Sequence, residues 1–189
     1  GLTMTTAPER WDASWRNNKR AAILADEAGV DFLLPIGRWN GYHGKTDFQG
    51  SAFETLTWAS GLLACTQQVT VCGTLHVRFA NPVFAAKQMV TADHIGEGRF
   101  ALNIVSGWNQ GEFDMFGVEL VPHESRYSYT GEWVDVVKRI WSETEPFDHD
   151  GQWMKLKAVS SKPRPWNDKF PLLISAGAST YGREFAVRH

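Results

Sequence analysis

The chain has 189 residues, 43% of them hydrophobic, and a formal net charge of −2 at pH 7, which suits one sizeable hydrophobic core. The nearly balanced charge offers no basic face for nucleic acid, and no apolar run approaches the roughly 20 residues of a membrane-spanning helix. The two cysteines and the histidines show no metal-ligand spacing, so we expect buried free thiols and no metal site.

In chain order, the first predicted helix covers residues 14–28 and is followed by Gly29, a residue typical of helix C-termini. The apolar run VDFLLPI then predicts a buried strand at 31–36. A long loop at 37–50 follows this strand. It lies at the C-terminal end of the strand, where parallel α/β proteins place their functional loops.

This loop contains Gly44-Lys45-Thr46, which resembles the end of a nucleotide-binding P-loop. The motif requires a glycine five residues before its Gly-Lys pair, and Trp39 stands there instead. The next helix begins only after Ser51 and Glu54, which have the spacing of a capping box. We therefore expect no nucleoside triphosphate at this loop.

The remaining elements continue the alternation of helices and strands. We expect a helix at about 52–65, a strand at 69–77, a helix that Asn81 caps and that ends near Gly96, a strand at 99–106, a helix at 125–142, a strand at 171–176 and a last helix after Ser179. The segment 143–170 interrupts this order. Its Asp150-Gly151 pair between apolar runs predicts a β-hairpin insertion.

Strands this uniformly apolar are typical of parallel strands that are covered on both faces. Two architectures fit, an open doubly wound sheet and a (β/α)₈ barrel, and the long polar and aromatic loops after the strands favour the barrel. The four predicted strands are half of the eight in a barrel, which typically takes about 250 residues. We therefore expect a partial (β/α)₈ TIM barrel, a single domain over 1–189 that is a fragment of a longer protein.

Three segments in the same order resemble a known family. HIGEGRFALNIVSGWNQGEFDMFG, HESRY and ISAGASTYGREFA are similar to the flavin-dependent monooxygenases of the bacterial-luciferase-like group, especially those that oxidise dimethylsulfone, alkanesulfonates or pyrimidines. The resemblance covers essentially the whole chain, including the hairpin. It implies a luciferase-like (β/α)₈ barrel.

The resemblance also implies residues that bind FMN. In relatives, the asparagine matching Asn103 lies on the flavin, an acidic residue matching Glu112 contacts the cofactor, and the backbone at Ile36 and Gly37 approaches the flavin. From the residues alone, Asn103 is better explained as a structural asparagine. A solvated loop charge explains Glu112 equally well, and a simple turn explains Gly37.

A phosphate site is expected where two helices begin. His123, Arg126 and Tyr127 stand at the start of the helix at 125–142, and a helix N-terminus beside a guanidinium favours an anion. Ser179 stands at the N-cap of the last helix, a common phosphate position in (β/α)₈ barrels. The alternatives are a cap cluster with His123 exposed, and an ordinary N-cap serine.

Three further residues are candidates for the substrate side of the site. His76 and Arg78 follow the second strand, and Trp108 closes the third. For His76 a structural role is favoured by the residues alone, and no catalytic base is assigned. Aromatic residues, with tryptophan unusually frequent at nine, are suited to a wall that keeps water away.

The resemblance implies an FMN-dependent monooxygenase that oxygenates a small organic substrate with O₂ and reduced FMN. It implies a separate flavin reductase as partner, a homo-oligomer and a cytoplasmic location. Two other functions stay open, a non-catalytic flavin-binding barrel and an oxidoreductase that transfers hydride with the deazaflavin F420. The family set NIVSGW and SRY favours FMN over the deazaflavin.

Overall fold

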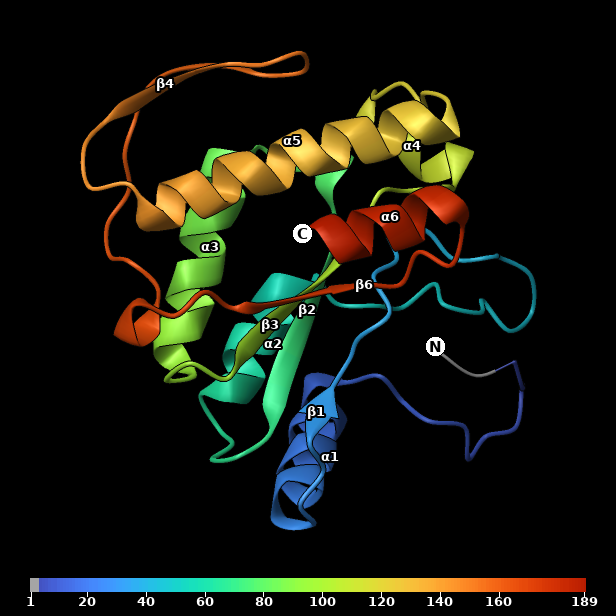
Figure 1. Cartoon of the computed structure of the whole chain (residues 1–189). Helices are drawn as coiled ribbons and strands as arrows, with labels where there is room; N and C mark the ends of the chain where they lie inside the picture. The colour runs from blue at the N-terminus through green and yellow to red at the C-terminus, as the bar shows by residue number, and fades with distance from the viewer. Residues whose placement is uncertain (1–3) are drawn as a thin grey trace.

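The computed structural model of the chain describes residues 4–189. Its centre is a four-stranded sheet in the order β1-β2-β3-β6, in which every neighbouring pair is parallel. The strands are β1 (Phe32–Leu33), β2 (Thr70–His76), β3 (Phe100–Val105) and β6 (Leu172–Ser175). The predicted set of adjacent parallel strands is confirmed. β1 and β6 form the two edges of this sheet (Figure 1).

Helices precede, connect and follow the strands, and most of them lie on one face of the sheet (Figure 1). They are α1 (Trp15–Glu27), α2 (Thr55–Leu63), α3 (Pro82–Ile95), α4 (Gln110–Phe116), α5 (His123–Ser142) and α6 (Thr180–Arg188). Asn81 and Ser179 cap α3 and α6 as predicted, since each side chain accepts a hydrogen bond from the first turn of its helix. Gly29 follows α1 with φ +76°, the left-handed conformation that favours glycine.

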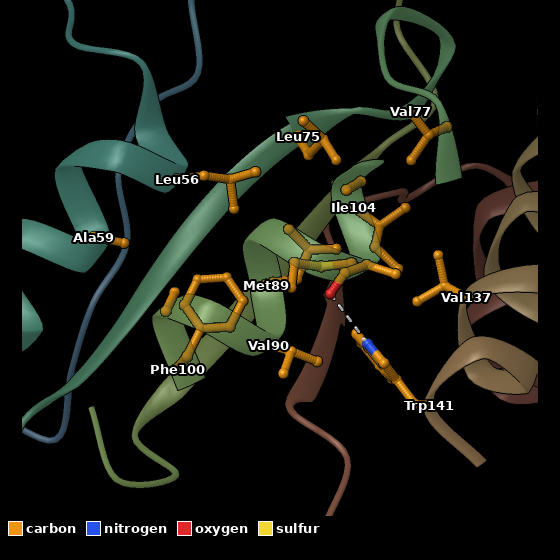
Figure 2. Packing of buried hydrophobic residues seen from close by; sticks show 14 of the residues in the cluster. Leu56, Ala59, Leu75, Val77, Met89, Val90, Phe100, Ile104, Val137 and Trp141 are labelled. Atoms are coloured by element: carbon orange, nitrogen blue, oxygen red, sulfur yellow. Dashed lines mark hydrogen bonds between the residues drawn. The ribbon is translucent and has the colours of Figure 1, made fainter. Parts of the chain in front are cut away.

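The hydrophobic core lies between the helices and one face of the sheet. Leu75 of β2 and Phe100 and Ile104 of β3 point toward the helices and are buried there, as Figure 2 shows. On the helix side, Trp141 of α5 fills the layer, and its indole nitrogen donates a hydrogen bond to the carbonyl of Ala86 in α3 at 3.4 Å. Alternate residues of β2 and β3 therefore face the other side, where Thr74, His76 and Asn103 lie.

The residues of β2 and β3 on that other face are buried too, so the expectation of strands buried on both faces is confirmed for the two central strands and is wrong for the edges of the sheet. The large apolar residues exposed there or on its flanking edges are Phe32 (54%), Leu34 (47%), Ile36 (47%) and Leu172 (62%). In a closed barrel the side chains of all strands fill the interior together. Four strands supply only an arc of such a layer.

The segment 143–170 contains the predicted hairpin. Strands β4 (Phe147–Asp150) and β5 (Lys155–Val159) pair antiparallel and lie beyond α5 (Figure 1). The turn is wider than a two-residue Asp150-Gly151 turn, because β5 begins only at Lys155 and the Gly151 amide donates to the Met154 carbonyl. The carboxylate of Glu132 on α5 accepts hydrogen bonds from the amides of Trp153 and Met154, and this fixes the hairpin to the helix.

Three boundaries differ from the prediction for physical reasons. Strand β1 stops at Leu33, because Pro35 has no amide hydrogen with which to continue the ladder. Helix α2 begins at Thr55, because Glu54 itself caps it by accepting from the amides of Leu56 and Thr57, so the capping box at Ser51 was wrong. Helix α5 begins at His123 rather than 125.

Helix α4 was not predicted at all. Asn109 caps it, since its side chain accepts from the amide of Glu112, and Gly117 ends it with φ +63°. Both residues are standard helix boundaries. With Gly111 inside and only 7 residues, the segment reads as a polar loop in the sequence.

Candidate active site

A cavity of ≈ 370 Å³ opens at the C-terminal ends of β1, β2 and β3. Its walls come from the end of β1, from the loop 37–50 and from side chains that follow each strand. The lining residues are Leu34, Pro35, Ile36, Gly37, Arg38, Tyr42, Gln49, Thr74, His76, Asn103, Val105 and Trp108. Five predicted site residues therefore lie at one cavity, at the end of the sheet where parallel α/β barrels place their chemistry.

A second hollow lies between α1, α2 and the outer side of β1, and it has a different character. Its wall is almost entirely apolar, and no charged side chain lines it. A binding site for a reactive substrate needs a few convergent polar groups. The cavity at the strand ends has them, and we take it as the candidate site.

Asn103 is the most informative residue of this cavity. It is 7% exposed, and its side-chain nitrogen donates to the hydroxyl of Thr74 at 3.2 Å. That hydroxyl donates its own proton to the carbonyl of Pro35 at 2.7 Å, so it must accept from Asn103, and this fixes the orientation of the amide. The Asn103 oxygen has no hydrogen-bond partner among the described residues.

Gly37 is packed against the same threonine. A Cβ at this position would lie 2.8 Å from the Cγ2 of Thr74 and 3.2 Å from its carbonyl oxygen. A side chain would therefore push the end of β1 away from β2. The glycine is required by this close approach within the protein, so an approaching cofactor is not needed to explain it.

Glu112 is 1% exposed, so the reading of a solvated loop charge was wrong. One carboxylate oxygen accepts a hydrogen bond from the amide of Trp39 at 2.9 Å and lies 3.4 Å from the Nε of Arg38. The Arg38 contact is an ion pair without hydrogen-bond geometry, since that Nε has no hydrogen-bond partner. The other oxygen lies 3.8 Å from the Nε2 of His76.

His76 lies in the wall of the cavity, and its ring stacks on Phe79 at 5.6 Å. Burial lowers the pKa of His76, the Glu112 carboxylate opposes this shift, and Arg38 adds to it. Aromatic rings continue behind Phe79, which contacts Phe113 and Phe116 at 4.8 and 4.3 Å. These rings form an aromatic cluster behind His76, whereas the tyrosine and tryptophan that line the cavity itself are Tyr42 and Trp108.

The residues expected at a phosphate site also meet, although they are far apart in the sequence. The Nε2 of His123 lies 3.0 Å from the hydroxyl of Ser179, which accepts from the amide of Gly182 at 3.1 Å. Tyr127 lies against Gly177, where a Cβ would be 2.4 Å from its hydroxyl oxygen. The N-terminus of α6 and the first turn of α5 thus form one polar cluster.

Arg126 connects this cluster with the cavity. Its guanidinium donates to the carbonyl of Gly107, next to Trp108 in the cavity wall, and its Nε has no partner. Arg78 is placed differently from the prediction. It does not line the cavity, and its guanidinium lies over the ring of Tyr129 at 4.4 Å.

Thr74 and Arg38 are two of the cavity residues that were not predicted as site residues from the sequence. Thr74 is the register partner of Asn103 in the β2–β3 ladder, so two polar residues at matching positions of buried strands were the available signal. Arg38 carried no signal, because a guanidinium in a glycine-rich loop is ordinarily solvated. Its side chain is 5% exposed.

Within residues 4–189, no group of three or more histidine, cysteine or acidic side chains is placed to hold a metal ion. No helix in this range is long and apolar enough to cross a membrane.

The family model described as luciferase-like monooxygenase matches residues 2–189. The chain is 33% identical over 192 residues to the pyrimidine monooxygenase RutA of Rhizobium rhizogenes (strain K84), with 100% of this chain and 51% of the relative covered. It is 32% identical over 188 residues to an FMNH₂-dependent dimethylsulfone monooxygenase of Pseudomonas fluorescens (strain Pf0-1), covering 100% of this chain and 50% of the relative. The chain thus spans about half the length of these relatives.

Solved structures agree on the fold. The riboflavin lyase RcaE, crystallised with modified FMN and riboflavin, superposes with a TM-score of 0.82 at 22% identity, over 94% of this chain and 46% of that one. DmoA from Hyphomicrobium sulfonivorans superposes with a TM-score of 0.78 at 22% identity, over 89% of this chain and 43% of that one. The prediction of a luciferase-like fold, present as a partial barrel, is confirmed.

Proposed function

Because the chain belongs to the luciferase-like monooxygenase family, we propose that it forms the flavin-binding part of a monooxygenase that uses reduced FMN and O₂ to oxygenate a small organic substrate. The relatives named above act on pyrimidines and on dimethylsulfone. The substrate of this protein is proposed only within that class of small polar compounds. A separate reductase supplies the reduced flavin in this proposal, and both proteins act in the cytoplasm.

The observation that carries the proposal is the unpaired oxygen of Asn103. A buried amide oxygen without a partner is costly and calls for a ligand that donates a hydrogen bond. The flavin ring edge carries an N–H between carbonyl groups. That N–H can donate to Asn103, whose amide orientation is already fixed by Thr74.

The polar cluster of His123, Tyr127 and Ser179 suits the phosphate of FMN. Ser179 caps a helix of 9 residues, and a helix N-terminus favours an anion through its dipole and its free amides. His123 and Tyr127 add two hydrogen-bond donors beside it. Arg126 contacts the carbonyl of Gly107, between the cavity and this cluster, and adds a positive charge.

The residues of this chain perform binding, orientation and exclusion of water in the proposed reaction. FMN, when bound, supplies the chemistry that activates O₂. Tyr42 and Trp108 line the cavity, Phe79, Phe113 and Phe116 pack behind His76, and such apolar surroundings protect reactive species from water. His76 lies in the cavity wall, with the Glu112 carboxylate 3.8 Å from its Nε2.

Flavin binding is tested with the variant Asn103→Leu, which removes the unpaired oxygen at similar volume. We expect the FMN dissociation constant, measured by quenching of flavin fluorescence, to rise about tenfold or more, the usual effect of a lost buried hydrogen bond. Asn17→Leu on α1, whose side chain is half-buried but does not line the cavity, is the matched control and should bind as the original protein does. Equal binding by all three proteins would contradict the Asn103 assignment.

Oxygenation is tested by supplying photoreduced FMN and ¹⁸O₂ with uracil or dimethylsulfone and measuring ¹⁸O in the product by mass spectrometry. Incorporation that requires the protein supports the monooxygenase. Tight FMN binding without incorporation into any compound of this class supports a flavin-binding protein instead. Turnover of an alcohol with F420 and no O₂ would support a hydride-transfer enzyme.

A further inference from the structure

Glu112 differs from the polar residues that line the cavity because it is 1% exposed and lies behind the wall that they form. One oxygen receives the Trp39 amide and faces Arg38, and the other faces His76. The residue lies on α4, whereas its partners lie on the loop after β1 and at the end of β2. A buried carboxylate is tolerated only with such compensation.

One carboxylate oxygen of Glu112 is therefore committed to the loop 37–50, whereas the contact of the other with His76 is longer than a hydrogen bond. We propose that Glu112 is a positioning residue, which acts through Arg38, Trp39 and His76 to hold the loop 37–50 as a wall of the cavity. The inference rests on the proposed function only in treating this cavity as the binding site.

The loop 37–50 needs an anchor because its own backbone is strained. His43, Asp47 and Gln49 have φ values of 57°, 41° and 61°, a conformation that costs free energy for residues other than glycine. The loop closes on itself through the Tyr42 amide and the Phe48 carbonyl at 3.0 Å. Its buried tie to the rest of the protein is the pair of contacts with Glu112.

Arg38 transmits this anchoring to the cavity surface. Its guanidinium lies over the rings of Tyr42 and Trp108, at 5.2 and 5.3 Å from their centres. Both rings line the cavity. Because the Glu112 carboxylate fixes the base of this stack, loss of its charge should release Arg38 and the two rings together.

His76 reports on the same carboxylate in an independent way. The charged groups that face it are Glu112 from α4 and Arg38 from the loop, and its ring stacks on Phe79. Glu112 is the only one of these influences that raises the pKa of His76. Replacing the carboxylate with an amide should therefore lower this pKa further, whereas a purely steric role predicts no change.

The first experiment compares Glu112→Gln and Glu112→Ala with Asp114→Asn, an exposed carboxylate on the same helix, in the purified protein without ligand. Hydrogen–deuterium exchange follows the Trp39 amide, which should exchange faster in Glu112→Gln and about tenfold or more faster in Glu112→Ala. Amides of β2 should keep their protection in every variant. A Trp39 amide that exchanges equally in the original protein and in Glu112→Gln and Glu112→Ala would overturn the proposal.

The second experiment follows the His76 ring by NMR titration, assigned with His76→Gln. A lower pKa in Glu112→Gln and no shift in Asp114→Asn are expected. An unchanged pKa of His76 in Glu112→Gln overturns the electrostatic part of the role.

The third experiment separates positioning from direct contact with a double-mutant cycle on FMN binding that adds Arg38→Met. If Glu112 acts through Arg38, the single changes and the double change weaken binding by similar factors. Factors that multiply would show that Glu112 acts independently of Arg38, and this overturns the proposal. If no protein in the cycle binds FMN, the proposed function fails, while exchange and titration still decide the role of Glu112.

Discussion

Ser179 combines a structural role with the proposed phosphate contact, and one substitution separates them. Aspartate is as good an N-cap as serine, so Ser179→Asp should keep α6 folded while it places a negative charge beside the phosphate. We expect the FMN dissociation constant to rise by about tenfold or more, because a hydrogen bond to a charged group, worth about 1.5–3 kcal/mol, is replaced by repulsion. Riboflavin, which lacks the phosphate, should bind to the original protein and to the variant with similar affinity, and titration calorimetry with both ligands measures this.

A substitution of Arg126 tests the same proposed phosphate site by removing a positive charge. Its guanidinium donates to the Gly107 carbonyl beside the cavity, so Arg126→Ala removes a contact to the loop together with a positive charge. If the charge contacts the phosphate, FMN binding should weaken by about 1.5–3 kcal/mol and riboflavin binding should barely change. Equal weakening of both ligands would mean that Arg126 holds the loop near Gly107 and makes no phosphate contact.

The residues of the site show what the sequence can and cannot predict. Asn103 could be singled out because it is a polar residue in an apolar strand. Ser179 could be singled out because a serine directly before a helix is a typical N-cap. The burial of Glu112 and Arg38 was not predictable, since it depends on α4 meeting a loop 73 residues away in the sequence. For His76, the choice between a structural and a functional role depends on the same distant carboxylate.

At the scale of elements, Asp26 joins α1 to the start of β2. Its carboxylate accepts hydrogen bonds from the amides of Gln67, Gln68 and Val69, at 2.7, 2.8 and 2.6 Å. The bonds from Gln67 and Val69, with smaller contributions from Gln68 and Arg99, hold the pKa of Asp26 below its usual value of 3.8. Asp26→Asn should lower the melting temperature at pH 7, because one amide oxygen cannot accept all three bonds.

The pH dependence of this effect has a definite sign. A carboxyl group whose pKa is lower in the folded state stabilises the protein above its unfolded pKa, and this contribution is lost as the pH falls through the folded value. The difference in melting temperature between the original protein and Asp26→Asn should therefore shrink as the pH falls below 3.8. Asp31→Asn, an exposed aspartate, is the control, and a difference that stays constant with pH would contradict this explanation.

Elements with a strong periodic pattern were predicted well, and those shaped by single contacts were not. The long helix α5 and the buried strands β2 and β3 follow from spacing alone. The early end of β1 depends on one proline, and the start of α2 depends on Glu54 taking the cap position. The short α4 forms because Asn109 caps it and because Glu112 and Phe113 are buried.

The whole molecule presents an open sheet with apolar residues beside its edges. β1 and β6 have no further strand neighbour among residues 4–189, and Phe32 and Leu172 next to these edges are 54% and 62% exposed. Open strand edges that carry exposed apolar side chains favour association with another chain. The expectation of a homo-oligomer can be tested at these strand edges.

We predict that the 189-residue chain self-associates through the open edge at β1 and that Phe32→Lys weakens the association. Burying a phenylalanine side chain contributes about 1.5–3 kcal/mol, so the dissociation constant should rise about tenfold or more, as measured by sedimentation velocity over a range of concentrations. Leu24→Lys is the matched control, because Leu24 on α1 is also 54% exposed but lies away from the strand edge. If both lysine variants weaken association equally, the contact is general hydrophobic adhesion, and if the original chain stays monomeric at every concentration, the edge needs no partner.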